Sequence, residues 1–129
     1  MSNIKTLVTG AGGFIGSAVV RKLLARGRSV RALLAPGERR TNLSGLDLEI
    51  VEGDITSRDA MGAAMKGVDR VYHLAAIYQL WLPDPGLMYR VNVEGSKTVL
   101  WAAYKAGVSR VVFTSSIAAI GARSDGQPA

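Results

Sequence analysis

The sequence has no cysteine, a single histidine and few aromatic side chains: two tryptophans, four tyrosines and two phenylalanines among 129 residues. The absence of cysteine excludes a disulfide framework and a thiolate metal site; we expect no metal centre, and the composition fits a reducing cytoplasm. No apolar run approaches the ~20 residues of a membrane-spanning helix. Met1 to Lys5 leads straight into an apolar segment, which leaves no room for a signal peptide. We therefore expect a cytoplasmic chain that does not span a membrane.

The chain also lacks a concentrated basic patch, although its net charge is +6, from sixteen basic and ten acidic side chains. The basic residues are scattered, and aromatic residues do not lie between them as a nucleic-acid platform requires. We interpret the charge mainly as solvated helix surface, with an excess that suits an anionic cofactor or substrate. We expect no nucleic-acid partner.

Glycine, by contrast, is abundant, with fifteen residues, and a cluster of them lies in Thr9 to Gly16. An apolar run precedes this stretch, and an amphipathic segment, Phe14 to Arg26, follows it. In such a strand–turn–helix, Gly10 allows the tight turn, Gly13 lets a pyrophosphate approach the backbone, and Gly16 lets the helix pack closely. The stretch predicts a dinucleotide-binding turn; the alternative is a plain tight turn in an α/β protein.

Apolar runs and helical periodicities alternate along the rest of the chain. We expect strands at residues 4–9, 29–34, 46–52, 70–75 and 110–115, and helices at residues 14–26, 56–66 and 84–106. The expected helix ends are Gly27, Gly67 and Gly107. Thr56 with Asp59 forms a capping-box pattern, and Asp84 with Pro85 is typical of an N-cap and first helical position. Gly95 inside the last helix costs ~1 kcal/mol relative to alanine, which indicates a close approach there.

Strands that alternate with helices predict right-handed crossovers and a Rossmann-like, doubly wound α/β fold, with a parallel sheet and helices on both faces. A glycine turn after the first strand favours the order 3-2-1-4-5. The apolar–polar alternation of residues 46–52 fits an edge strand, as this order requires. We expect residues 1–129 to form one dinucleotide-binding domain.

Four blocks follow in order along the chain: Thr9 to Gly16, His73-Leu74-Ala75-Ala76, Asn92-Val93-Glu94-Gly95 and Thr114-Ser115-Ser116. Together they resemble the extended short-chain dehydrogenases/reductases, the NAD-dependent epimerase/dehydratase family. The segment from Tyr78 to Asn92 looks like the dihydroflavonol-reductase-like branch, and in particular the hopanoid-associated sugar epimerases of bacteria.

This resemblance implies a role for each matching position. Gly10, Gly13, Phe14 and Ile15 would cradle the pyrophosphate. Asp54 and Ile55 match the pair that contacts the adenine. The strand end that runs beside the ribose and nicotinamide corresponds to Leu74, Ala75 and Ala76, braced by Asn92. Thr114 and Ser115 come at the end of the fifth strand, where ligands of open α/β sheets collect.

Ser116 matches the catalytic serine or threonine of the family. Its hydroxyl would hydrogen-bond the substrate oxygen while hydride moves, and so stabilise developing charge. The alternative is a polar strand end whose hydroxyls hydrogen-bond their own loop.

Three other residues have a structural interpretation beside a functional one. His73 stands among apolar residues of a strand with no carboxylate partner indicated nearby, which favours a structural role over catalysis. Tyr78 and Trp81 are either ordinary packing residues or walls of the substrate pocket, because their loop follows the cofactor-binding strand end.

The chain departs from the family pattern in its cofactor determinant. An NAD-specific site has an acidic residue at the end of the second strand, to accept hydrogen bonds from the ribose diol; here Leu34 and Ala35 stand there. Arg39 and Arg40 follow a few residues on and are within reach of a 2′-phosphate. The cofactor is therefore NAD or NADP, with a slight preference for NADP.

A second departure concerns catalysis. The family's Tyr-x-x-x-Lys follows Ser116 at a greater distance than this chain extends, and Tyr72, Tyr78, Tyr89 and Tyr104 have no lysine four residues later. We interpret the chain as the N-terminal part of a longer protein, without its substrate domain. We expect it to be inactive alone and its fifth strand to be an exposed edge, and we expect the full-length protein to be a homodimer.

Three functions follow as hypotheses. The leading one is an NAD(P)-dependent epimerase or dehydratase acting on a nucleotide-linked or lipid-linked sugar. The alternatives are an NAD(P)H-dependent carbonyl reductase and a non-catalytic NAD(P)-binding redox sensor.

Overall fold

The computed structural model describes residues 4–129, in which five parallel strands form one sheet in the order β3-β2-β1-β4-β5. This is the predicted order. The strands are β1 (Lys5–Thr9), β2 (Ser29–Leu34), β3 (Glu49–Glu52), β4 (Val68–His73) and β5 (Arg110–Phe113). β1 lies in the centre, paired in parallel with β2 on one side and β4 on the other.

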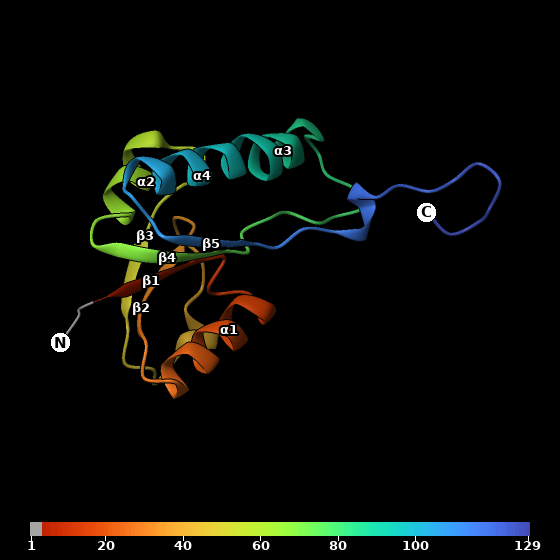
Figure 1. Cartoon of the computed structure of the whole chain (residues 1–129). Helices are drawn as coiled ribbons and strands as arrows, with labels where there is room; N and C mark the ends of the chain where they lie inside the picture. Colours follow the sequence, from red (N-terminus) through yellow and green to blue (C-terminus); the bar gives the residue numbers. More distant parts are fainter. Residues whose placement is uncertain (1–3) are drawn as a thin grey trace.

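Helices cover both faces of the sheet, as Figure 1 shows. On one face lies α1 (Phe14–Ala25). On the other lie α2 (Arg58–Ala64) and a long helical rod that consists of α3 (Gly86–Tyr89), the π-helical turn η2 (Arg90–Gly95) and α4 (Ser96–Lys105). Two hydrophobic clusters fill the spaces between these layers, one centred on Val8 and Val20 and the other on Val71 and Val99.

Glycines end the two longest helices as predicted. Gly27, with φ +73°, follows α1, and the next N–H, that of Arg28, donates to the Leu23 carbonyl at 3.0 Å. Gly107, with φ +74°, follows α4 in the same way. A side chain at either position would be strained in this left-handed conformation.

Two helix starts differ from the predictions. The N-cap of α2 is Ser57, whose hydroxyl accepts the Ala60 N–H, and not Thr56. Thr56 instead donates its N–H and its hydroxyl to Asp54. α3 begins at Gly86, one residue later than expected, although the Asp84 carboxylate does accept the Gly86 N–H at 3.0 Å.

The boundaries of four strands also differ. β1 begins at Lys5 instead of residue 4. β3 begins at Glu49 instead of residue 46, and β5 ends at Phe113 instead of residue 115. β4 runs from Val68 to His73 instead of residues 70–75. It ends early because the next two N–H groups, of Leu74 and Ala75, donate to the Thr9 hydroxyl oxygen and not to a neighbouring strand.

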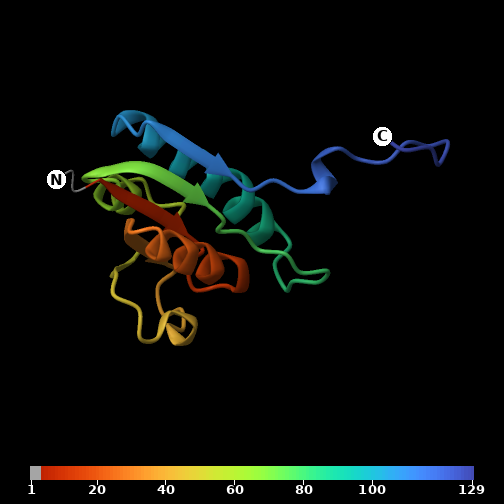
Figure 2. The same cartoon turned by 60° about the horizontal axis from the view of Figure 1, so that its bottom comes forward.

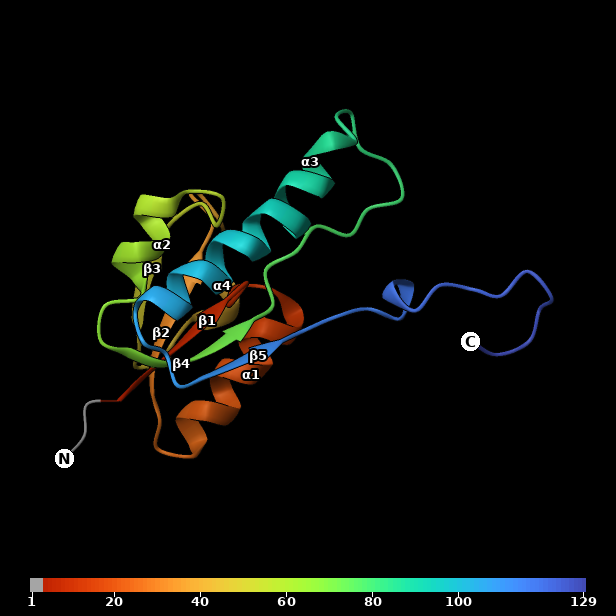
Figure 3. The ribbon, with the colours of Figure 1, turned by 45° about the horizontal axis from the view of Figure 1, so that its top comes forward.

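Gly95 confirms the predicted close approach. A Cβ atom there would lie 2.5 Å from Cδ1 of Ile55, so the absence of a side chain lets the helical rod pack on Ile55, in the segment after β3. Figure 3 shows this rod as one continuous helix across the sheet.

After β5 the chain forms a short 3-10 turn, η3 (Ile117–Ala119), and runs out away from the layers (Figure 2). Within residues 4–129, no helix is long and apolar enough to cross a membrane.

Candidate functional site

A cleft of about 850 Å³ opens at the carboxyl ends of the central strands. It brings together the glycine turn after β1, the ends of β2 and β3, and the segments after β4 and β5. Most of the residues predicted to bind a cofactor line it: Gly10, Gly13, Phe14, Ile15, Asp54, Ile55, Leu74, Ala75, Ala76 and Thr114. The sequence blocks that are far apart in the chain therefore meet at one edge of the sheet.

The glycines of the turn are required for different reasons. Gly10 has φ +65°, and a Cβ there would lie 2.8 Å from the Ala75 nitrogen. A Cβ on Gly16 would lie 1.9 Å from the Gly10 carbonyl oxygen, so this position cannot carry a side chain without moving the backbone. Gly13 is exposed, and its nearest neighbour would be 3.4 Å away. Only Gly13 leaves space that a ligand can occupy.

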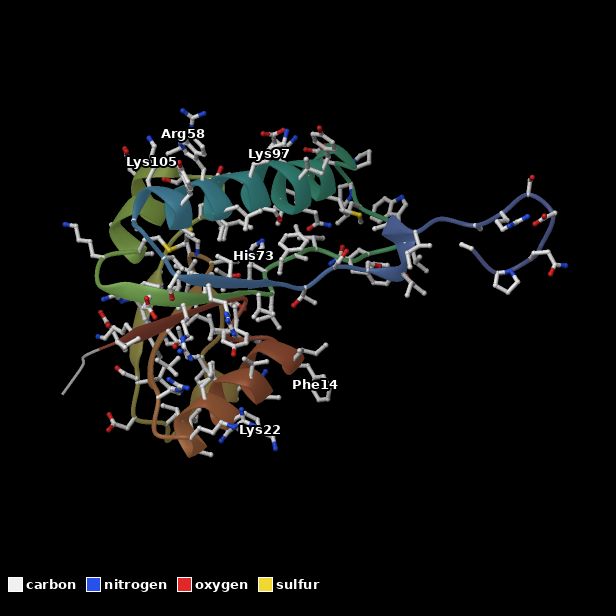
Figure 4. The ribbon with its side chains drawn as sticks, viewed as in Figure 1. Phe14, Lys22, Arg58, His73, Lys97 and Lys105 are labelled. Carbon is white, nitrogen blue, oxygen red and sulfur yellow. The ribbon has the colours of Figure 1, made fainter. Side chains whose placement is uncertain are left out.

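The N-terminus of α1 faces this space. Its N-cap, Gly13, provides no side-chain hydrogen bond, and no acidic residue stands in the first turn. Phe14 is 91% exposed and projects outward at the end of α1, as Figure 4 shows. Free N–H groups at a helix N-terminus carry partial positive charge. The turn is therefore a suitable binding site for a phosphate anion.

Glu38 is a residue of the cleft that the sequence interpretation missed. Its carboxylate accepts the Ala35 N–H at 2.9 Å, directly after β2. Its other oxygen would lie 2.9 Å from a Cβ on Gly12, a glycine that is buried against Leu34. The loop from Ala35 to Gly45 has no periodicity, so only a folded structure reveals which of its side chains turns back to the strand end.

Arg39 and Arg40 do not line the cleft. The Arg40 guanidinium forms an ion pair with Glu52, with 3.1 Å between Nη2 and Oε1, and both side chains are about half exposed. Such an exposed pair is worth little, so it leaves the Arg40 side chain free to change partners.

Asp54 and Ile55 line the cleft just beyond the end of β3. Hydrogen bonds from the Thr56 backbone N–H (2.9 Å) and hydroxyl (2.7 Å) lower the pKa of the Asp54 carboxyl, which keeps it ionised at neutral pH. The Ile55 side chain is buried under Gly95. Ile55 therefore supports the cleft as a buried packing residue.

Asn92 holds the segment after β4 by two hydrogen bonds. Its Oδ1 accepts the Ile77 N–H, and its Nδ2 donates to the Ile77 carbonyl, both at 2.7 Å. Asn92 lies in the π-helical turn η2, a distortion that is frequent at functional sites. This pair of bonds fixes the backbone just after Leu74, Ala75 and Ala76.

The three residues after β5 differ in their position relative to the cleft. Thr114 lines the cleft, and its N–H still donates to the His73 carbonyl at 3.2 Å. Ser115 and Ser116 are exposed and do not line the cleft, and the Ser116 hydroxyl oxygen accepts the Ala118 N–H at 3.1 Å. The geometry of Ser116 is that of the structural alternative, a hydroxyl bonded to its own loop.

The two aromatic residues of the loop after β4 are both exposed, Tyr78 by 86% and Trp81 by 77%. Tyr78 lines the cleft, whereas Trp81 does not. Of the two substrate-pocket predictions, the structure thus places only Tyr78 beside the candidate site.

His73 is buried and lies between the sheet and α4 (Figure 4). Burial lowers its pKa to about 4, so the ring is neutral at physiological pH. Its partners are the hydroxyl groups of Thr9 and Ser96. Within residues 4–129, neither hydrogen-bond partner of the ring is a carboxylate, as the structural interpretation expects.

A second groove, of about 970 Å³, lies on the outer face of α2 and α4, where Arg58, Lys97 and Lys105 point away from the sheet (Figure 4). It is larger than the cleft, but it lies away from the strand ends where ligands of open α/β sheets bind. Among residues 4–129, no three His, Asp or Glu side chains come together as a metal-ligand set.

Comparisons with known proteins agree on one family. The chain is 45% identical over 122 residues to a Synechocystis sp. protein named "Putative dihydroflavonol 4-reductase", covering 95% of this chain and 35% of that protein. It is 41% identical to cinnamoyl-CoA reductase 1 of Oryza sativa over 88% of this chain and 34% of the relative. The structure of Thermus thermophilus UDP-glucose 4-epimerase with NAD matches with a TM-score of 0.78 at 33% identity, covering 88% of this chain and 38% of that one.

The chain thus spans about a third of the length of these relatives. The model of the NAD dependent epimerase/dehydratase family matches residues 6–129, from β1 through the glycine turn to the segment after β5. The chain belongs to the NAD dependent epimerase/dehydratase family.

Proposed function

We propose that the chain binds a nicotinamide dinucleotide in the cleft, as the cofactor-binding part of an NAD(P)-dependent oxidoreductase of the epimerase/dehydratase type. One observation carries this proposal. The uncapped N-terminus of α1 faces open space beside Gly13, while Gly10 and Gly16 have no room for any side chain. This is the geometry that a pyrophosphate requires.

The lining residues suit the successive parts of a dinucleotide. The backbone from Gly13 to Ile15 would bind the pyrophosphate, and the ionised Asp54 would accept hydrogen bonds from the adenine end. Leu74, Ala75 and Ala76 would form the floor under the ribose and nicotinamide, which supplies or accepts hydride when bound. Small side chains at Ala75 and Ala76 keep this floor open.

For the chemical step, we propose that Ser116 hydrogen-bonds the substrate oxygen and stabilises its developing charge. This requires the Ser116 hydroxyl to release the Ala118 N–H, an exposed bond of 3.1 Å, and to turn toward the cleft. The chain contains no Tyr-x-x-x-Lys, and we expect no turnover from these 129 residues alone.

We propose that the loop after β2 decides between NAD and NADP. Arg39 and Arg40 favour a 2′-phosphate, and the Glu38 carboxylate opposes it by charge repulsion. Glu38→Gln is expected to tighten NADP binding and leave the Kd for NAD within about a factor of two, whereas Arg39→Ala with Arg40→Ala weakens NADP alone. Equal affinities for both dinucleotides in all three proteins would contradict this proposal.

The substrate class we propose is a nucleotide-linked or lipid-linked sugar, and the resemblance of residues 78–92 supports a hopanoid-associated epimerase. The similarity to two proteins with reductase names favours the second candidate, a carbonyl reductase. A redox sensor is the alternative outside the enzyme class.

The reading frame that follows codon 129 in the gene tests these functions directly. A Tyr-x-x-x-Lys motif supports an enzyme, and its absence supports the sensor. Purified full-length protein then separates the two enzymes. An epimerase converts its sugar without net consumption of NAD(P)H, whereas a reductase consumes one equivalent per product. We expect the full-length protein to sediment as a homodimer.

A further inference from the structure

The Thr9 hydroxyl connects β1 with the end of β4 and with the backbone that follows β4. Thr9 is fully buried at the end of β1. Its Oγ1 accepts the N–H groups of Leu74 and Ala75, both at 3.0 Å, and lies 2.7 Å from Nδ1 of His73. One side chain on the central strand therefore holds the backbone that follows β4.

These three contacts determine where the proton on the His73 ring lies. A threonine hydroxyl offers two acceptor positions and one O–H donor. The N–H groups of Leu74 and Ala75 occupy both acceptor positions, so the O–H must donate to Nδ1 of His73. Nδ1 is then unprotonated, and the neutral ring carries its proton on Nε2. Burial, which lowers the pKa of His73, keeps the ring in this neutral form.

The other ring nitrogen extends the connection to the helical layer. Nε2 of His73 lies 2.9 Å from the hydroxyl oxygen of Ser96, the first residue of α4. As Nε2 bears the proton, it donates and the serine oxygen accepts. A continuous series of hydrogen bonds thus links the Leu74 and Ala75 amides, through Thr9 and His73, to α4.

Two sides of the cleft, the glycine turn and the Leu74–Ala75 backbone, depend on these hydrogen bonds. Gly10 follows Thr9 directly, and its Cα hydrogens face the Ala75 backbone, because a Cβ would lie 2.8 Å from the Ala75 nitrogen. Leu74 and Ala75 line the cleft from the other side. The Thr9 hydroxyl therefore joins the backbone of the glycine turn to the backbone that follows β4.

We propose that His73 is a positioning residue for the dinucleotide: as the Nε2–H tautomer it orients the Thr9 hydroxyl, which sets the distance between the glycine turn and the Leu74–Ala75 wall. This inference rests on the proposed cofactor site. His73 does not line the cleft, and its effect passes through Thr9.

Matched variants separate positioning from simple stability. Thr9→Ser keeps the hydroxyl, whereas Thr9→Val keeps the shape and removes the oxygen. At a temperature where both variants are folded, Thr9→Val is expected to raise the Kd for the preferred dinucleotide at least about tenfold, and Thr9→Ser to stay within about threefold of wild type. His73→Asn offers an oxygen near the position of Nδ1 and should bind better than His73→Leu.

The tautomer is measurable without any cofactor. Because the chain contains one histidine, labelling with ¹⁵N-histidine gives the NMR signals of a single ring. The expected spectrum at neutral pH has an unprotonated Nδ1 and a protonated Nε2 in wild type and Thr9→Ser, and a mixture of tautomers in Thr9→Val.

The inference is overturned if the wild-type ring carries its proton on Nδ1, or if Thr9→Val and Thr9→Ser bind the dinucleotide equally well. A wild-type chain that binds neither NAD nor NADP overturns the proposed function instead. In that case the tautomer measurement still decides whether the bonds between Thr9, His73 and Ser96 are as assigned.

Discussion

At the residue scale, the glycine turn separates two requirements that the sequence motif presents as one. Gly16 is required by the fold, because any side chain there would overlap the Gly10 carbonyl oxygen. Gly13 is not, since its surroundings are open on the side of the cleft. Folding and ligand binding are therefore expected to respond to different substitutions within the same turn.

Gly16→Ala is expected to lower the free energy of unfolding by about 1–3 kcal/mol, the usual cost of overpacking a tight site. Gly13→Ala is expected to change it by less than about 0.5 kcal/mol, as for a surface substitution, while weakening dinucleotide binding. Urea denaturation of both variants and wild type measures the difference. Equal losses of stability would show that Gly13 is also a folding residue.

His73 predicts a pH dependence of stability. Its pKa is about 4 in the folded chain, against 6.5 for an ordinary histidine. Because the unfolded chain binds the proton more tightly between these values, stability is complete above pH 6.5 and falls as the pH drops toward 4, by up to about 3 kcal/mol.

Urea denaturation between pH 4.5 and 7 measures this loss, with His73→Asn as the control that cannot titrate. Above pH 4.5, carboxylates with lowered pKa values, such as Asp54 and Glu49, remain ionised. The same pH dependence in wild type and His73→Asn would contradict the assignment.

At the element scale, the sequence predicted the features that repeat and missed those that depend on contacts between distant segments. Alternating strands and helices were enough for the parallel order, and glycine positions for the ends of α1 and α4. The early end of β4 depends on the Thr9 side chain, which comes from another strand. The position of Glu38 depends on how an irregular loop folds back. Neither leaves a periodic signal.

The contact between the helical rod and the segment after β3 can be tested by substitution at Gly95. Gly95→Ala is expected to cost about 1–3 kcal/mol, because the new Cβ overlaps the Ile55 side chain, whose Cδ1 would be 2.5 Å away. In an Ile55→Val background, which lacks that methyl group, the cost of Gly95→Ala should be smaller. A double-mutant cycle with no coupling between the two sites would contradict the contact.

The π-helical turn is expected to fix the floor of the cleft through Asn92. Asn92→Asp keeps the acceptor for the Ile77 N–H and loses the donor to the Ile77 carbonyl, against which it places a negative charge. We expect faster amide hydrogen exchange after β4, from about residue 75 to 80, with the exchange of α1 unchanged. Uniformly faster exchange over the whole chain would indicate general destabilisation instead.

At the scale of the whole molecule, two hollowed surfaces could bind a ligand, and they differ in the elements that line them. The strand ends converge on the cleft with its uncapped helix N-terminus, and the outer face of α2 and α4 carries a larger groove among lysine and aromatic side chains. The net charge of +6 attracts an anion to either surface. It therefore does not indicate which surface binds the dinucleotide. We propose the strand ends as the dinucleotide site because the uncapped N-terminus of α1 lines the cleft there.

Amide NMR of the ¹⁵N-labelled chain, titrated with NAD, tests this assignment most directly. We expect chemical-shift changes at Gly13 to Gly16, at Asp54 and Ile55, and at Leu74 to Ala76, with little change at Lys97, Trp101 and Lys105 in the outer groove. Changes confined to the outer groove, or no saturable change at the glycine turn with either NAD or NADP, would contradict it.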